Sequence, residues 1–80
     1  MILTKKEVEF IKNKIDKGQE LLENRNWELV LRKLDTLELN SGYVDGEPEK
    51  GLNETGQFIE DLIDKIAYDD GDDNELIVTE

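Results

Sequence analysis

Apolar residues recur along this chain at the three- and four-residue spacing that places side chains on one side of an α-helix. The first run begins at a capping box, in which Thr4 and Glu7 each satisfy a free backbone amide at the helix start. Leu3 and Val8 stand where a hydrophobic staple fixes the direction of the entering chain. This spacing constrains the fold more than any other feature, and it predicts helices rather than strands.

Three such runs are separated by residues typical of turns. In the first run Gly18 interrupts the apolar stripe, so it either lets a neighbouring helix approach closely or ends the helix early. A second helix is expected after Asn26, a natural N-cap, and a third from about Asn53 or Thr55 to Tyr68. The apolar stripes of the three helices are, in chain order, Val8, Ile11, Ile15 and Leu22; Trp27, Val30, Leu31, Leu34 and Leu37; and Phe58, Ile59, Leu62, Ile63 and Ile66.

The expected fold is therefore a mainly α, small three-helix domain. Residues 1–39 form a helical hairpin, and residues 54–68 form the third helix. Between them, residues 40–53 form a Gly-rich loop, and a structureless loop of that length is uncommon inside a compact domain. The loop either holds a short strand near 42–45, with Asp-Gly as its turn, or is a mobile functional loop. The closing segment 75–79 is apolar and β-prone, and it is a candidate partner for that strand.

The length of 80 residues allows one small domain, residues 1–80, with a single hydrophobic core. The chain has no Cys, which excludes disulfides and thiol chemistry, and no His, the commonest general base and metal ligand. Paired carboxylates can catalyse only in a pocket that separates their pKa values, and so small a domain has little interior for one. We therefore expect a protein that is not an enzyme and has no cofactor.

The net charge of −11 disfavours direct binding to nucleic acid or to an anionic membrane, because phosphates would repel the protein. The opening residues, MILTKKEVEF, contain no apolar run long enough for a signal peptide or a membrane span. A cytoplasmic location is expected.

The charge is distributed very unevenly between the two halves of the chain. Residues 1–39 carry eight basic and eight acidic residues, so their net charge is zero. Residues 40–80 carry two basic and thirteen acidic residues, which gives all of the −11. Such asymmetry is typical of an interaction region or of an acidic tail, here the segment 69–80.

The carboxylates of the third helix are the first candidates for contact with a partner. Glu60 and Asp64 are four residues apart with Asp61 beside them, so one outer face of the helix carries a row of negative charge. Carboxylates one helical turn apart are separated by about 6 Å, and DNA carries roughly one charge per 3.4 Å along each strand. Tyr43 is the preferred hot spot, because tyrosine is favoured at interfaces. The candidate partner-binding residues are Tyr43, Asp45, Glu47, Glu60, Asp61, Asp64, Asp69, Asp70, Asp72 and Asp73.

These observations favour a small acidic binding module that inhibits or modulates a basic, nucleic-acid-handling protein. In composition the whole chain, small, cysteine-free, very acidic and helical, resembles phage-encoded inhibitors of host machinery, some of which stand in for DNA. No single motif carries this resemblance. Two other interpretations stay open: acidity that serves solubility alone, and an assembly protein that buries its apolar helix faces as a homodimer.

A further alternative concerns the closing stretch AYDDGDDNELIVTE, which partly matches the calcium loop of an EF-hand. With Asp69 at loop position 1, Asp73 falls at position 5 and Glu80 at position 12. Position 3 holds a glycine, however, and position 6 lacks the glycine that the loop requires. The alternative is therefore weak Ca²⁺ binding, with Asp69, Asp73, Glu75 and Glu80 as the candidate ligands.

Overall fold

The computed structural model describes residues 1–69 and 75–80. In these residues the protein is mainly helical, with four α-helices and a short two-stranded parallel sheet, so the expected class is confirmed. The elements are, in chain order, β1 (Ile2–Thr4), α1 (Lys5–Lys14), α2 (Gly18–Glu23), α3 (Trp27–Ser41), the 3₁₀ turns η1 (Val44–Gly46) and η2 (Pro48–Lys50), α4 (Glu54–Ala67) and β2 (Ile77–Thr79).

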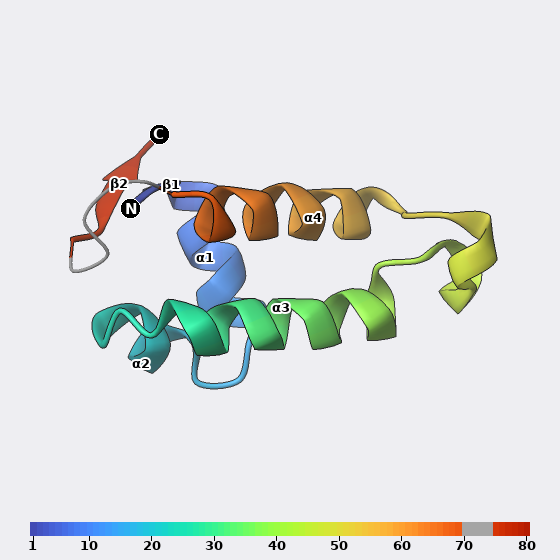
Figure 1. Ribbon diagram of the computed structural model, residues 1–80, viewed down its shortest axis with the longest axis horizontal. Helices are drawn as coiled ribbons and strands as arrows, with labels where there is room; N and C mark the ends of the chain where they lie inside the picture. Colours follow the sequence, from blue (N-terminus) through green and yellow to red (C-terminus); the bar gives the residue numbers. More distant parts are fainter. Residues whose placement is uncertain (70–74) are drawn as a thin grey trace.

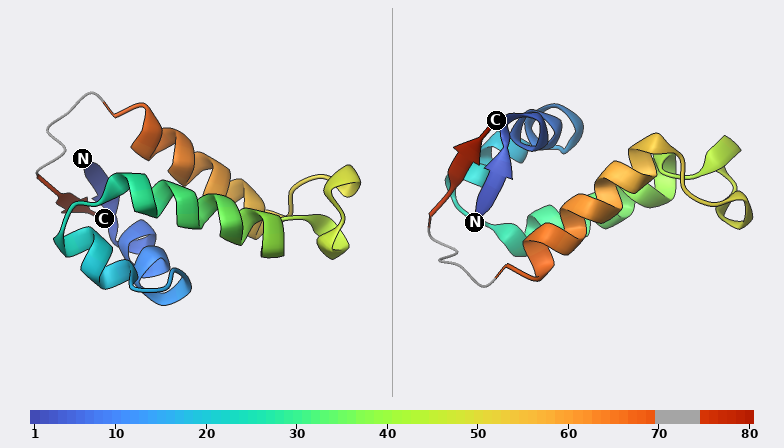
Figure 2. Two further views of the ribbon diagram at one scale, coloured as in Figure 1. Left: turned by 60° about the horizontal axis from the view of Figure 1, so that its bottom comes forward. Right: turned by 90° about the horizontal axis from the view of Figure 1, so that it is seen from above.

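The two longest helices, α3 and α4, lie side by side and antiparallel, and they make the most extensive contact between elements (Figure 1). Helices α1 and α2 pack across one side of this pair near one end, and η1 and η2 extend from the other end (Figure 2). The result is an elongated domain of 37 × 22 × 21 Å.

The predicted helix starts are present. At α1 the Thr4 hydroxyl accepts from the Glu7 amide at 3.1 Å, and the Glu7 carboxylate accepts from the Thr4 amide at 2.8 Å, which completes the capping box. Asn26 caps α3, with its side-chain oxygen 3.4 Å from the Leu29 amide nitrogen. Asn53 caps α4 in the same way, because its side-chain oxygen accepts from the amide of Gly56, three residues on.

The first helical run is interrupted near Gly18, one of the outcomes that the sequence left open, because the chain bends between α1 and α2. Ile15 is extended, and Lys17 adopts a left-handed conformation with φ of 59°. Gly18 then starts α2 so close to α1 that a Cβ atom there would lie 2.0 Å from the Ile11 carbonyl oxygen. The principal antiparallel pair is consequently α3 with α4, and not a hairpin within residues 1–39.

The closing segment forms a strand as expected, but its partner is different. β2 pairs in parallel with β1, in the register Ile2 with Ile77 and Leu3 with Val78. Tyr43 instead forms an isolated antiparallel bridge with Leu52, so the proposed pairing of 42–45 with 75–79 is wrong. Tyr43 and Leu52 are close in the sequence, so closing the loop between them costs less entropy than pairing Tyr43 with the distant C-terminal segment.

The loop between α3 and α4 is fastened by Asn53, the α4 cap. Its amide side chain donates to the carbonyls of Ser41 and Tyr43, at 3.0 and 3.2 Å, and its backbone amide donates to the Gly42 carbonyl at 3.0 Å. Its side-chain oxygen accepts from the Gly56 amide at 2.7 Å. One residue therefore connects the end of α3 to the start of α4.

One hydrophobic core collects the three predicted apolar stripes. Trp27, with 8% of its surface exposed, packs in this core as expected. Burying one large aliphatic side chain contributes about 1.5–3 kcal/mol relative to leaving it in water, so a core of this size can order a small domain. The buried apolar residues among those described are Met1, Leu3, Val8, Ile11, Ile15, Leu21, Leu22, Trp27, Val30, Leu34, Ile59, Leu62 and Ile66.

Gly56 is buried where α4 begins, and a Cβ atom there would lie 2.0 Å from the Gly42 carbonyl oxygen. In an ordinary helix, Gly56→Ala would stabilise by about 1 kcal/mol. Here we expect it to lower the free energy of unfolding by about 1–2 kcal/mol, because the backbones must separate. Urea denaturation followed by circular dichroism measures the change. The exposed neighbour variant Thr55→Ala should be neutral or slightly stabilising, and a stabilised Gly56→Ala protein would contradict the close contact.

Candidate partner-binding surface

Glu38 is a buried carboxylate near the end of α3, with 8% of its surface exposed. Burial raises the pKa of Glu38, and the nearby carboxylates of Glu60 and Asp35 raise it further, whereas a hydrogen bond from Tyr43 acts in the opposite direction. Its Oε2 atom is buried and has no hydrogen-bond partner among the described residues. Glu38 is therefore a desolvated acid held beside other acids.

Four carboxylates gather along one edge of the α3–α4 pair. Asp35 lies one turn before Glu38 on α3. Glu60, which acts electrostatically on Glu38, begins a second row on α4. Asp64 follows Glu60 by four residues and so lies on the same side of α4. We call these four residues, Asp35, Glu38, Glu60 and Asp64, the acidic face.

Glu60 of the acidic face lies on the side of α4 that is turned away from α1. The ring of Phe58 contacts that of Phe10 on α1, with centroids 4.8 Å apart, so the Phe58 side of α4 faces α1. Glu60 follows Phe58 by two residues, which turns its side chain about 200° around the helix. Since α1 packs across one side of the α3–α4 pair (Figure 2), this rotation directs Glu60 away from α1.

Three other predicted acids, Asp45, Glu47 and Asp69, have cationic partners, whereas no ion pair among the described residues includes the acidic face. Lys50 lies 3.1 Å from Asp45 and 3.0 Å from Glu47, so both loop acids are compensated locally. Asp69 lies 3.5 Å from the N-terminal ammonium group. Within residues 1–69 and 75–80, the ion pairs leave out every carboxylate of the acidic face.

The structure thus brings some predicted residues together and separates others. Glu60 and Asp64 share the acidic face, and Tyr43 joins it through its hydrogen bond to Glu38. Asp61 is exposed on the outer side of α4 and accepts from the Gln57 side chain at 3.1 Å. Asp45 and Glu47 lie apart in the loop turns, and Asp69 lies at the opposite end of α4. Three predicted residues fall outside the described part of the chain: Asp70, Asp72 and Asp73.

The candidate calcium ligands are only partly described. Asp73 lies outside the described residues, and Glu75 is exposed. Glu80 pairs with Lys5 at 3.3 Å, and Asp69 pairs with the N-terminal ammonium group. Among the residues that the structure describes, no group of three or more acidic side chains is arranged to hold a metal ion.

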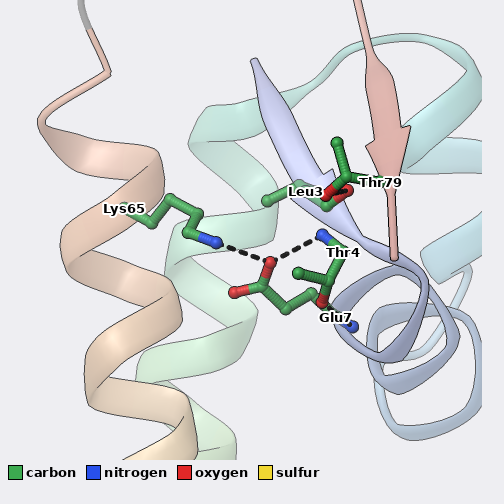
Figure 3. Close-up of polar contacts among 5 residues, drawn as sticks. All are labelled: Leu3, Thr4, Glu7, Lys65 and Thr79. Carbon is green, nitrogen blue, oxygen red and sulfur yellow. Dashed lines mark hydrogen bonds and ion pairs between the residues drawn. The ribbon is translucent and has the colours of Figure 1, made fainter.

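A second buried carboxylate, Glu7, joins three parts of the fold (Figure 3). Its Oε1 atom accepts from the Thr4 amide at the end of β1 and from Lys65 of α4, with Nζ at 2.8 Å. Burial alone would raise the pKa of Glu7, but the hydrogen bonds from Lys65 and Thr4, together with the Lys65 charge, lower it overall. Glu7 therefore stabilises the fold.

An open cleft of about 360 Å³ lies between α1 and the start of α4. Phe10 and Phe58 form its apolar part, and the Lys6 ammonium group lies 5.7 Å from the centre of the Phe58 ring. Glu9 and Lys14 also line it, so the cleft shows no preference for one sign of charge. It does not extend the acidic face.

Sequence reasoning missed the contribution of α3 to the site. Because the net charge of residues 1–39 is zero, these residues were not considered as a binding surface. Asp35 and Glu38 were therefore not among the predicted site residues. A signal for Glu38 was present, because it follows the core residue Leu34 by four positions and so falls on the buried stripe of its helix. Acidic residues are rarely buried, so an acid on the apolar stripe of a helix indicates a special structural or functional role.

No protein family matches this chain, and neither a curated protein nor a solved structure matches it. Across the described ranges, none of the helices has the length and apolar character needed to cross a bilayer. Inferences about function therefore depend on the geometry described above.

Glu7→Gln tests the junction between β1, α1 and α4. Folding lowers the pKa of Glu7, so its contribution to stability is present above the ordinary value of 4.5 and is lost as the pH falls through the lowered value. We expect the variant to lose about 1 kcal/mol at neutral pH, because glutamine keeps the capping box but not the ion pair. Denaturation curves at neutral and acidic pH should show this loss shrinking in acid. The exposed Glu9→Gln is the control, and a loss that is independent of pH would contradict this role.

Glu38→Gln is expected to raise the free energy of unfolding at neutral pH, whereas Glu7→Gln lowers it. Folding raises the pKa of Glu38, so the free energy of unfolding falls as the pH rises from the ordinary value of 4.5 through the raised value. The variant should be more stable by about 0.5–1 kcal/mol at neutral pH, because it removes a desolvated charge beside two like charges. The gain should vanish in acid. Thermal melts of this variant and of the exposed loop variant Glu49→Gln measure the effect, and destabilisation at neutral pH would refute it.

Proposed function

We propose that this protein is a binding module whose acidic face docks on a basic surface of a partner protein that handles nucleic acid. One observation carries the proposal: four carboxylates from two helices share one uncovered surface with no cationic partner among the described residues. In the free protein this arrangement opposes folding, and a partner's cations would relieve the repulsion.

The contrast with the rest of the chain supports a directed surface. If acidity served solubility alone, charged residues of both signs would be interspersed, as they are where Lys50 contacts Asp45 and Glu47. The acidic face instead gathers one sign of charge, and its most buried member, Glu38, lies near a carboxylate of each helix. A stability disadvantage that a fold retains is often associated with function.

The geometry also supports a partner that normally holds a nucleic acid. Packed helices lie about 8–10 Å apart, and carboxylates within each row are about 6 Å apart. Two such rows present a density of negative charge comparable with that of a phosphate backbone. We therefore propose that the acidic face occupies a basic groove of the partner protein, and that this inhibits or modulates the partner.

The test is capture from a bacterial lysate by the tagged protein, with elution by rising salt and competition by duplex DNA. We expect a basic protein that DNA displaces. The variant Asp35→Asn, Glu60→Gln, Asp64→Asn should lose it, because the charge of the face is removed and screening by salt already weakens such contacts.

The matched control changes the same number of charges in the loop: Asp45→Asn, Glu47→Gln, Glu49→Gln. It should capture the partner at the wild-type level. Equal capture by both variants, or a partner held regardless of salt and DNA, would overturn the proposal. Circular dichroism of each variant shows whether its helix content is retained, so that loss of binding is distinguished from unfolding.

A further inference from the structure

Glu38 differs from the other members of the acidic face because it is buried and incompletely bonded. Its side chain is 8% exposed, and Oε2 has no hydrogen-bond partner among the described residues. Tyr43 supplies a hydrogen bond to the carboxylate, which leaves the other oxygen free. A buried acceptor without a donor destabilises the free protein, and a donor brought by another molecule would remove that penalty.

The backbone around Glu38 is shaped to hold this side chain. A Cβ atom at Gly42 would lie 2.9 Å from the Glu38 Cγ atom and 2.7 Å from its carbonyl oxygen, so only glycine leaves room there. Gly56 of α4 in turn lies directly against the Gly42 carbonyl. The Glu38 side chain is consequently confined as far as its Cγ atom, whereas its carboxylate, with Glu60 and Asp35 nearby, keeps its last torsion.

We propose that the acidic face receives an arginine side chain of the partner, whose guanidinium group bonds the free oxygen of Glu38. This inference rests on the proposed function and specifies its anchor. Binding requires the carboxylate to turn about its last torsion, which is broad in glutamate, so that the free oxygen meets the guanidinium. The remaining N–H groups of the guanidinium then point to Glu60 and Asp35.

A guanidinium fits this arrangement better than other cations. It carries five N–H donors in a planar fork and can bond several carboxylates at once, and it is more weakly hydrated than an ammonium group. Lysine offers a compact, strongly hydrated charge that gains less from a recessed oxygen. A metal ion is disfavoured, because the described part of the chain has no three acidic groups arranged to hold one.

Two peptides of equal charge, an arginine hexapeptide and a lysine hexapeptide, provide the probes. Titration calorimetry should show that the wild-type protein binds the arginine peptide about tenfold more tightly than the lysine peptide. Glu38→Gln, which should fold at least as well as the wild type, is expected to abolish this preference. Glu49→Gln, in the loop, should retain it. In NMR spectra the amides of Gly42 and Tyr43 should shift with the arginine peptide only.

The outcomes separate this inference from the proposed function. Equal affinity of the wild type for both peptides, or a preference that survives in Glu38→Gln, overturns the arginine site. If that happens while the triple variant of Asp35, Glu60 and Asp64 still loses the captured protein, the acidic face remains the docking surface without this anchor. If the triple variant captures the partner normally, the proposed function fails whatever the peptides show.

Discussion

The close approach of α3 and α4 at Gly42 and Gly56 is the constraint on which the rest of the structure depends. No Cβ atom fits between the two backbones at this point, so the end of α3 and the start of α4 lie directly against each other. Their apolar stripes then meet each other and α1 in one core. The same approach brings the polar edges of the helices together, and Glu38 consequently lies beside Glu60. Core and acidic face are two results of one packing geometry.

The relative size of the energies explains why the fold can hold like charges together. Each buried aliphatic side chain of the core contributes about 1.5–3 kcal/mol, whereas a pair of like charges at helical spacing opposes folding by a few tenths of a kcal/mol. Burial therefore exceeds repulsion by about an order of magnitude. At the opposite end, the ion pair of Glu7 with Lys65 connects the start of α1 to α4. A two-stranded sheet is marginal by itself, so β1 and β2 depend on this junction and on the burial of Leu3.

Local signals in the sequence were sufficient to predict the helix starts and the core, because capping and periodicity act within a few residues. The Thr4–Glu7 box, the Asn26 cap and the Asn53 cap are all present. Gly18 indicated an interruption before α2 as one of two alternatives, but the left-handed Lys17 that makes the bend belongs to a residue type that carries no turn signal. Pairing of β2 with β1 could not be derived either, because strand pairing across the length of a chain depends on the tertiary fold. For the same reason, Glu60 could be assigned to a surface row, but its proximity to Glu38 could not be derived.

Net charge by itself says little about where a protein is negative. The loop acids are numerous, yet Lys50 compensates two of them, and Asp69 and Glu80 pair with the N-terminal ammonium group and Lys5. The described carboxylates that keep their full effect on a partner are those without a nearby cation, and α3 and α4 gather four of them. Burial strengthens this effect, because a charge in a low-dielectric setting is screened less than one in water. For the proposed docking, Glu38 and Glu60 would therefore be the strongest determinants of the acidic face, because they are its least exposed members.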